Sequence, residues 1–257
     1  MLDYINLYKK NGYIINNILS HKQCDEIIDF INNNDINSYY EKFNNNKFGH
    51  NFTLNDKPIK ENIIKNKFIN NFATNILGDY TINTVKSYNK CSFMARDIEY
   101  HQEFYYNDHH PTRNNWEDYI QIFIALEDHS LDNACLKIIP KSHTLGVLPY
   151  IDIVNSNLEH KKAVEYNSLK EAYNKFGILN CNLKKGEGII FNHLIIHGSQ
   201  NNNGPLSRKS LVITINKSDL NLNKTKFNEF EKKRKIINIE ILENKINELK
   251  KQINKIN

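Results

Sequence analysis

Two histidines and a glutamate carry the most specific chemistry in this chain of 257 residues. His101 and Glu103 are separated by one residue in Glu99-Tyr-His-Gln-Glu-Phe-Tyr-Tyr106, a segment rich in the aromatic residues of β-strands. Residues i and i+2 of a strand point to the same face, so this imidazole and carboxylate are expected side by side. His197 ends the apolar run that starts at Gly188, which predicts a second strand. Two histidines and one carboxylate, with open positions opposite, are the ligand set of non-haem Fe(II) oxygenases.

A second group of residues predicts an anion site beside this metal. Ser199 follows His197 by two residues, and Arg208 lies just before the strand-like run Leu211-Val-Ile-Thr-Ile215. A guanidinium offers paired donors that match a carboxylate, and a nearby hydroxyl adds a further hydrogen bond. The sequence therefore predicts a carboxylate clamp next to the metal.

With these residues the chain resembles the phytanoyl-CoA dioxygenase family of Fe(II)- and 2-oxoglutarate-dependent oxygenases, over residues 3–216. The similar segments are Tyr8–Ile15, Leu19–Ile27, Ala125–Asp128, Asn133–Leu136, Ile139–His143, Gly186–Phe191, His197–Ser199 and Arg208. The resemblance implies that His101, Glu103 and His197 bind iron. It also implies that Ser199 and Arg208 hold the distal carboxylate of 2-oxoglutarate. The sequence departs from the family at two positions, because the family usually has Asp at position 103 and Gly at position 141.

The resemblance implies a mainly β fold with flanking helices: a double-stranded β-helix, or cupin-like jelly roll, over residues 1–216, followed by a C-terminal helix. Local patterns predict a helix after the N-cap candidate Ser20 and an amphipathic helix over residues 59–77, ended by Gly78. Residues 80–88 and 119–126 predict strands, the second buried on both faces. Residues 151–176 predict a helical insertion, which is either a lid or a packing decoration.

Composition argues against two other classes of function. The net charge of +5 resides in the tail, because the chain from Lys217 onward holds 11 Lys or Arg and 6 Asp or Glu. Residues 1–216 are therefore formally neutral, which gives no support for nucleic-acid binding. No apolar run reaches membrane-spanning length, so neither a signal peptide nor a membrane span is expected. Four well-separated cysteines predict free thiols in a reducing compartment, hence a cytoplasmic location.

The tail, residues 217–257, is predicted to be basic and helical. Between residues 239 and 256 apolar residues repeat at alternating spacings of three and four, with Ile at a and mostly Leu at d. This seam favours a short parallel coiled coil and a homodimer. Because it spans only about two and a half heptads, packing of the same helix against its own domain remains an equal alternative.

Other residues are weaker candidates for the site. Gln121 is the one polar residue within an apolar strand, and 2-oxoglutarate, a metal-bound water or a backbone carbonyl would satisfy its amide. Arg113 and Trp116 lie in a polar loop and are candidate substrate contacts. Lys86 would reach a cofactor carboxylate or lie exposed on its strand. Four other histidines (His109, His110, His143 and His193) are expected not to bind metal.

These patterns favour an enzyme that uses Fe(II), 2-oxoglutarate and O2 to hydroxylate a small or carrier-attached organic molecule, releasing succinate and CO2. One alternative is a non-catalytic jelly-roll scaffold that assembles partners through its coiled coil. Another is a zinc- or iron-binding cupin-like isomerase, which would need no Arg208. The sequence does not identify the substrate.

Overall fold

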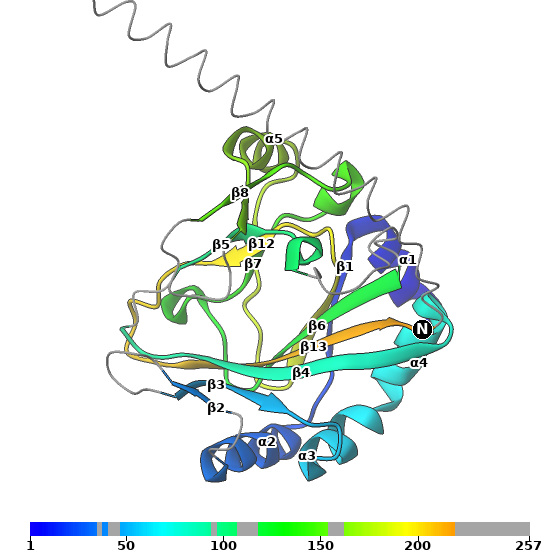
Figure 1. The fold of residues 1–257 in the computed structure, drawn as a ribbon, viewed down its shortest axis with the longest axis vertical. Coiled ribbons are helices and arrows are strands. Elements are labelled where there is room, and N and C mark those ends of the chain that lie inside the picture. Colours follow the sequence, from blue (N-terminus) through cyan, green and yellow to red (C-terminus); the bar gives the residue numbers. More distant parts are fainter. Residues whose placement is uncertain (35–37, 41–46, 94–96, 107–117, 154–161, 219–257) are drawn as a thin grey trace, which may run out of the picture.

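Two antiparallel sheets form the body of the protein (Figure 1), seen in a computed structural model that describes residues 1–34, 38–40, 47–93, 97–106, 118–153 and 162–218. The seven strands of the larger sheet are, in spatial order, β1 (Tyr13–Asn17), β11 (Glu187–Asn192), β6 (Tyr119–Ala125), β13 (Arg208–Lys217), β4 (Tyr80–Lys90), β3 (Lys47–Phe52) and β2 (Ser38–Tyr40). The smaller sheet has the order β10 (Leu179–Asn180), β7 (Lys137–Ile138), β12 (His197–Ser199) and β5 (Ile98–His101). The predicted jelly roll is confirmed by these two facing sheets.

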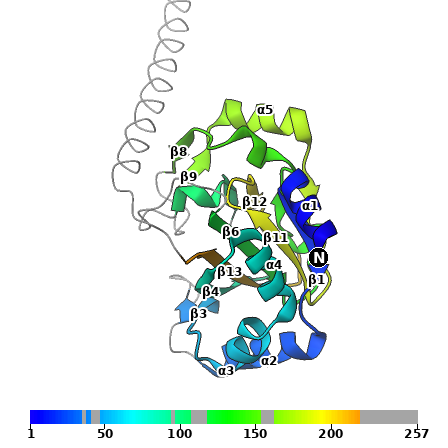
Figure 2. The same cartoon turned by 90° about the vertical axis from the view of Figure 1, so that its right-hand side faces the viewer.

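Helices cover the outer face of the larger sheet (Figures 1 and 2). They are α1 (Leu2–Asn11), α2 (His21–Asn33), α3 (Lys57–Ile59), a π-helical turn (Lys60–Ile64) and α4 (Lys67–Leu77). Ser20 caps α2, as predicted, and it forms a capping box with Gln23. The single helix predicted over residues 59–77 is wrong, because Asn66 accepts a hydrogen bond from the Ile69 N–H and starts α4 anew.

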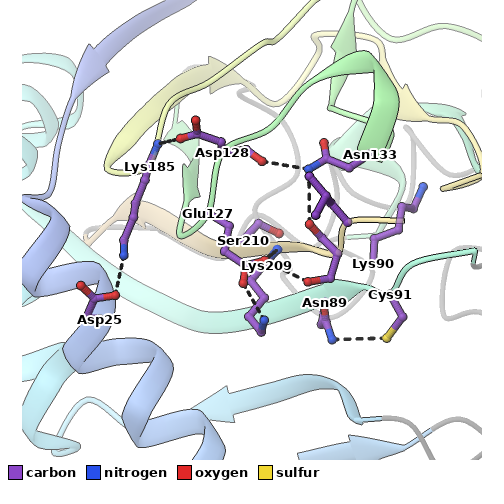
Figure 3. Close-up of polar contacts among 12 residues, drawn as sticks. Asp25, Asn89, Lys90, Cys91, Glu127, Asp128, Asn133, Lys185, Lys209 and Ser210 are labelled. Atoms are coloured by element: carbon purple, nitrogen blue, oxygen red, sulfur yellow. Dashed lines mark hydrogen bonds and ion pairs between the residues drawn. The ribbon is translucent and has the colours of Figure 1, made fainter. Parts of the chain in front are cut away.

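An ion pair links this helical layer to the turn before β11. Lys185 forms an ion pair with Asp25 of α2, while its backbone N–H donates to Asp128 (Figure 3). One face of β6 packs into the large core beneath the helices, through Ile120, Ile122 and Ile124. Exposed ion pairs contribute little energy, so this apolar core accounts for most of the stability of the layer.

The opposite face of the larger sheet meets the smaller sheet in a second core. Phe123 of β6 and Phe191 of β11 pack there with Ile138 of β7 and Ile195. Every residue of β6 is buried, which confirms the prediction of a strand covered on both faces. The inner side of this sandwich is where the candidate site residues gather.

Two predicted elements differ in the structure. The strand predicted over residues 188–197 is two strands, β11 and β12, because the chain turns at residues 193–195 and changes sheet. The predicted helical insertion includes a two-stranded sheet, β8 (Tyr150–Asp152) with β9 (Lys162–Val164), before α5 (Tyr166–Phe176). The predicted C-terminal helix and coiled coil lie outside the described residues and stay predictions. Across the described ranges, none of the helices combines the length and apolar character that a membrane span requires.

The turn at Lys141 explains one departure from the expected family pattern. Lys141 adopts the left-handed backbone conformation, with φ of 62°, at the start of the 3-10 helix Ser142–Leu145. Glycine reaches this region without steric cost, whereas a residue with a Cβ is strained there. Lys141 therefore alters a turn and does not enter the metal site.

Candidate metal centre and anion pocket

Three side chains converge between the smaller sheet and the larger one. His101 Nε2 lies 3.7 Å from Glu103 Oε1, and His197 Nε2 lies 3.3 Å from the same oxygen. The ligand atoms of all three residues lie within 4.8 Å of one another, and both imidazoles are buried. Among the described residues, this is the one group of at least three His, Cys, Asp or Glu side chains placed to share a metal ion.

Strand pairing brings the two histidines together. β5 and β12 are antiparallel neighbours in which His101 and His197 are direct partners, and their ring centroids lie 4.3 Å apart. The register shifts between His197 and Ser199, and such a bulge re-aims side chains next to a site. A Cβ on Gly198 would lie 2.7 Å from the Ile98 carbonyl oxygen, so glycine permits this close pairing.

Glu103 reaches the centre by a different route from the one predicted. β5 ends at His101, and Glu103 begins a 3-10 helix (Glu103–Tyr106), so the two residues do not share a strand face. Between them Gln102 is fully buried and points elsewhere. Its side-chain amide donates to the carbonyls of Gly146 (2.9 Å) and Leu194 (2.8 Å), and its carbonyl accepts from the Leu148 N–H (2.9 Å). Gln102 thus holds the turn that aims Glu103 at the histidines.

Hydrogen bonds set the tautomer of each imidazole. His101 Nδ1 lies 2.6 Å from the Glu99 carbonyl oxygen, and His197 Nδ1 lies 2.9 Å from that of Ile195. Because a carbonyl oxygen only accepts, each neutral ring carries its proton on Nδ1 and directs the Nε2 lone pair at the centre. Backbone carbonyls commonly orient metal-bound histidines in this way.

The titration behaviour of the centre also suits a cation. Burial alone would raise the pKa of Glu103, but the hydrogen bonds that His101 and His197 donate when Nε2 carries a proton, with the positive charge of that form, hold it well below its usual value. Burial and the neighbouring His197 lower the pKa of His101. At neutral pH the centre therefore presents an ionised carboxylate with a neutral His101 imidazole, the protonation states that a metal ion needs.

Arg208 is the candidate anion-binding residue on the inner side of the larger sheet. It is the first residue of β13, is buried, and its Cζ lies 5.5 Å from the centroid of the Phe123 ring. Its Nε and Nη1 atoms are buried and make no hydrogen bond to any residue that the structure describes. Burial lowers its pKa to about 10, so it remains charged at neutral pH. A buried cation with unused donors calls for an anion from outside the chain.

Ser199 and Gln121 lie on the same inner side. Ser199 is buried and accepts a hydrogen bond from Lys90 Nζ at 2.8 Å. Gln121 pairs with Phe191, whose ring centroid lies 4.8 Å from that of His197. Gln121 Oε1 accepts from the Thr214 hydroxyl at 2.9 Å, a partner that none of the three sequence-based alternatives named.

The other candidates fall outside the cluster. His193 is buried and stacks on Tyr119, with 4.9 Å between ring centroids, and His143 lies 3.2 Å from the Lys9 carbonyl oxygen. Lys86 is half-buried on β4, where it pairs with Val212. The remaining four, Arg113, Trp116, His109 and His110, lie outside the described residues. Sequence reasoning missed Lys90 and Gln102, whose roles depend on contacts between distant segments.

Comparison with known proteins decides the family. The family model for phytanoyl-CoA dioxygenase (PhyH) matches residues 8–210, most of the chain. The chain belongs to the phytanoyl-CoA dioxygenase family. The family is one of non-haem Fe(II)- and 2-oxoglutarate-dependent oxygenases, so iron and 2-oxoglutarate are the cofactors that the site residues must fit.

Individual relatives of this PhyH chain agree with that assignment. A phytanoyl-CoA dioxygenase domain-containing protein 1 homolog from Dictyostelium discoideum is 30% identical over 98 residues, which cover 38% of this chain and 34% of that protein. EctD from S. alaskensis, solved with 2-oxoglutarate and 5-hydroxyectoine, matches with a TM-score of 0.71 and 18% identity over 87% of this chain and 78% of that one. The EctD structure with bound Fe matches with a TM-score of 0.68 and 20% identity, over 87% and 79%. At these identities the solved structures establish the fold.

The residues of this PhyH chain fit both cofactors. Two imidazole lone pairs and a carboxylate directed at one point repel one another unless a cation lies between them, and this donor set suits Fe(II). Arg208, with buried donors that no described residue uses, suits a carboxylate. The centre and the pocket therefore match the chemistry that the family requires.

Proposed function

We propose that the protein is an Fe(II)- and 2-oxoglutarate-dependent dioxygenase that hydroxylates a small or carrier-attached organic substrate, with release of succinate and CO2. His101, Glu103 and His197 would hold the iron, and Arg208 with Ser199 would hold the distal carboxylate of 2-oxoglutarate. The observation that carries the proposal is the convergence of the three ligand atoms within 4.8 Å, beside a buried arginine. Bound iron and 2-oxoglutarate would supply the activation of O2.

The protein's own part in this chemistry is orientation and exclusion of water. The Glu99 and Ile195 carbonyls hold the two imidazoles in the ligating tautomer. Phe123 and Phe191 line the inner core next to Arg208 and His197, and they keep this side of the site apolar. In such surroundings the ion pair between a guanidinium and a carboxylate is much stronger than in water. We expect no separate general base, because the cofactors perform the difficult step.

Further roles complete the proposal. Gln121 is proposed to contact the cosubstrate from β6, and Arg113 and Trp116 are proposed to contact the substrate. Residues 1–216 would be the oxygenase domain, and residues 217–257 a basic helical tail whose residues 239–256 would form a homodimer. The four cysteines are all free thiols, which supports a reducing, cytoplasmic environment.

Anaerobic titration of the purified protein with Fe(II) and 2-oxoglutarate tests the proposal. We expect a weak visible charge-transfer band for the wild type. Glu103→Ala should lose the band, because it removes one of three ligands, whereas Glu103→Asp should retain it. Glu99→Ala is the matched control, since this exposed glutamate lies four residues earlier and its side chain is outside the cluster.

A folded wild-type protein that binds neither Fe(II) nor 2-oxoglutarate would refute the oxygenase assignment and favour the scaffold alternative. Binding of Fe(II) without any effect of 2-oxoglutarate would instead favour the cupin-like isomerase. If mass spectrometry detects conversion of 2-oxoglutarate to succinate under O2, a screen of hydroxylation substrates is justified.

A further inference from the structure

A cavity of about 700 Å³ opens beside the end of the smaller sheet that lies away from the metal centre. Asp97, the residue before β5, and Gln200, the residue after β12, both line it. β5 and β12 pair at this end through Ile98 and Ser199. The extended chain from Asp97 to His101 spans roughly 13 Å. The cavity is therefore distinct from the candidate metal centre, and its volume is typical of small-molecule sites, about 300–1,000 Å³.

One wall of the cavity is the loop between β12 and β13, and a buried asparagine holds its shape. Asn202 is fully buried. Its side-chain amide donates to the carbonyl oxygens of Lys90 (3.2 Å), Cys91 (2.9 Å) and Leu206 (2.8 Å). Its own carbonyl oxygen accepts from the Gly204 N–H at 3.1 Å. These bonds tie the loop to the end of β4, so this wall is formed before any ligand arrives.

A second wall is the 3-10 helix Leu131–Asn133. The side chain of Asn133 donates to the Asp128 carbonyl oxygen at 2.9 Å and so fixes the helix to the end of the preceding strand (Figure 3). A Cβ on Gly204 would collide with the Asp132 carbonyl oxygen, so the two walls meet at that glycine. Preformed walls spare a ligand the cost of ordering them.

The groups that line the cavity are mostly planar and polar. They are two carboxylates and three primary amides, from Asp97, Asp132, Gln200, Asn201 and Asn203. A carboxylate only accepts hydrogen bonds, whereas a primary amide donates through nitrogen and accepts through oxygen. Lys137 donates to Gln200 Oε1 at 2.7 Å, so this amide presents its N–H groups to other partners. Within the lining that described residues form there is no Lys or Arg, so the cavity does not suit an anion.

This combination of groups matches hydroxyl groups better than an ammonium ion. A hydroxyl group both donates and accepts, so neighbouring hydroxyl groups can bond to carboxylates and to amide N–H groups at once. An ammonium ion only donates, and it would leave the amide N–H groups unused. Leu131 and Pro205 add apolar surface to the same lining, and Leu131 is 53% exposed. The C–H groups of a sugar ring would cover such a surface.

We propose that this cavity binds a saccharide, at a site separate from the metal centre. The carboxylates of Asp97 and Asp132 accept hydrogen bonds from hydroxyl groups of the sugar, and the three amides donate to others. The ring packs on Leu131 and Pro205. Binding needs neither Fe(II) nor 2-oxoglutarate, so the inference goes beyond the proposed function and does not rest on it.

Saturation-transfer NMR of the whole protein, without metal or 2-oxoglutarate, tests the proposal with the methyl glycosides of glucose, galactose and mannose. We expect at least one of them to bind with a dissociation constant of roughly 1 mM or below. Cadaverine and glutarate carry the charges of a cation and an anion without the hydroxyl groups, and both should bind more weakly. A wild type that binds none of the three glycosides, or that binds cadaverine more tightly than any of them, refutes the proposal.

Three variants locate the site. Asp97→Ala and Asp132→Ala each remove one acceptor and should raise the dissociation constant about tenfold, the effect of losing a hydrogen bond to a charged group. Asn203→Trp places a large ring in the cavity and should abolish binding. Asp79→Ala is the matched control, because this exposed aspartate lies just before β4, at the end of that strand opposite to Lys90.

Thermal unfolding of each variant distinguishes a loss of binding from a loss of folding. Asn201→Trp is a second way to fill the cavity, should Asn203→Trp lower the melting temperature. A sugar that binds at the metal centre as a substrate would still bind to either filled variant. Undiminished binding in a folded filled variant, or in both folded Asp→Ala variants, would therefore overturn this inference and leave the proposed function intact.

Discussion

Replacing Arg208 with methionine should stabilise the protein in the absence of 2-oxoglutarate and abolish its binding. Arg208 is buried, and within the described residues its Nε and Nη1 atoms have no hydrogen-bond acceptor. Methionine has a flexible apolar side chain that fills much of the same space without a charge. Replacement of a buried charge by an apolar side chain of similar volume is often neutral or stabilising.

The pKa of Arg208 gives the expected magnitude. Burial lowers it from 12.5 to about 10. Because the folded protein disfavours the charged form, holding the charge at pH 7 costs about 3 kcal/mol of folding free energy. The contact with the Phe123 ring offsets about 1 kcal/mol of this cost. The free energy of unfolding should therefore rise by about 2 kcal/mol in Arg208→Met.

Chemical denaturation with and without Fe(II) and 2-oxoglutarate checks this prediction. At a 2-oxoglutarate concentration 100 times its dissociation constant, the wild type should gain about 2.7 kcal/mol, whereas Arg208→Met should gain nothing from it. The control is Lys209→Met, which breaks the half-exposed 2.6 Å ion pair with Glu127 on the other face of β13 (Figure 3). It should change stability by less than about 1 kcal/mol and leave binding intact.

Either of two results would refute the reasoning about Arg208. The first is an Arg208→Met protein that is less stable than the wild type without 2-oxoglutarate, which would show that the guanidinium has a stabilising partner. The second is retained stabilisation by 2-oxoglutarate, which would place the carboxylate site elsewhere.

Two further predictions concern residues that support the site. Gln102→Leu should lower the free energy of unfolding by about 3 kcal/mol, because three backbone groups lose a buried partner, and should weaken Fe(II) binding in an anaerobic titration. Unchanged Fe(II) affinity would mean that Glu103 is held by other contacts. His129→Gln should reduce acid sensitivity. Burial lowers the pKa of His129 to about 3, so between pH 7 and pH 5 the unfolded imidazole gains a proton that the folded one does not. From pH 7 to pH 5 the free energy of unfolding of the wild type should therefore fall by about 2 kcal/mol more than that of the variant. Urea unfolding at both pH values measures this, and an equal fall in the two proteins would contradict it.

Several features of the protein follow from the sequence alone. The types and order of His101, Glu103, His197, Ser199 and Arg208 are sufficient to predict a metal site with an adjacent carboxylate clamp. Local chemistry also predicts Ser20 as an N-cap and the burial of β6, because capping and a continuous apolar run depend on neighbouring residues only. The cap and the buried strand agree with the structure, because predicting them needs no information about which strands pair.

Only the tertiary structure decided how these residues meet. The direct pairing of Lys90 with Arg208, and of His101 with His197, is a matter of strand register between segments about a hundred residues apart. Glu103 reaches the centre from a 3-10 turn that Gln102 anchors to two distant loops, and not from a shared strand face. Side-chain chemistry is encoded locally, whereas register and turn geometry depend on packing and hydrogen bonds across the whole fold. That difference is the physical reason why the sequence predicts the candidate ligands and the structure shows what positions them.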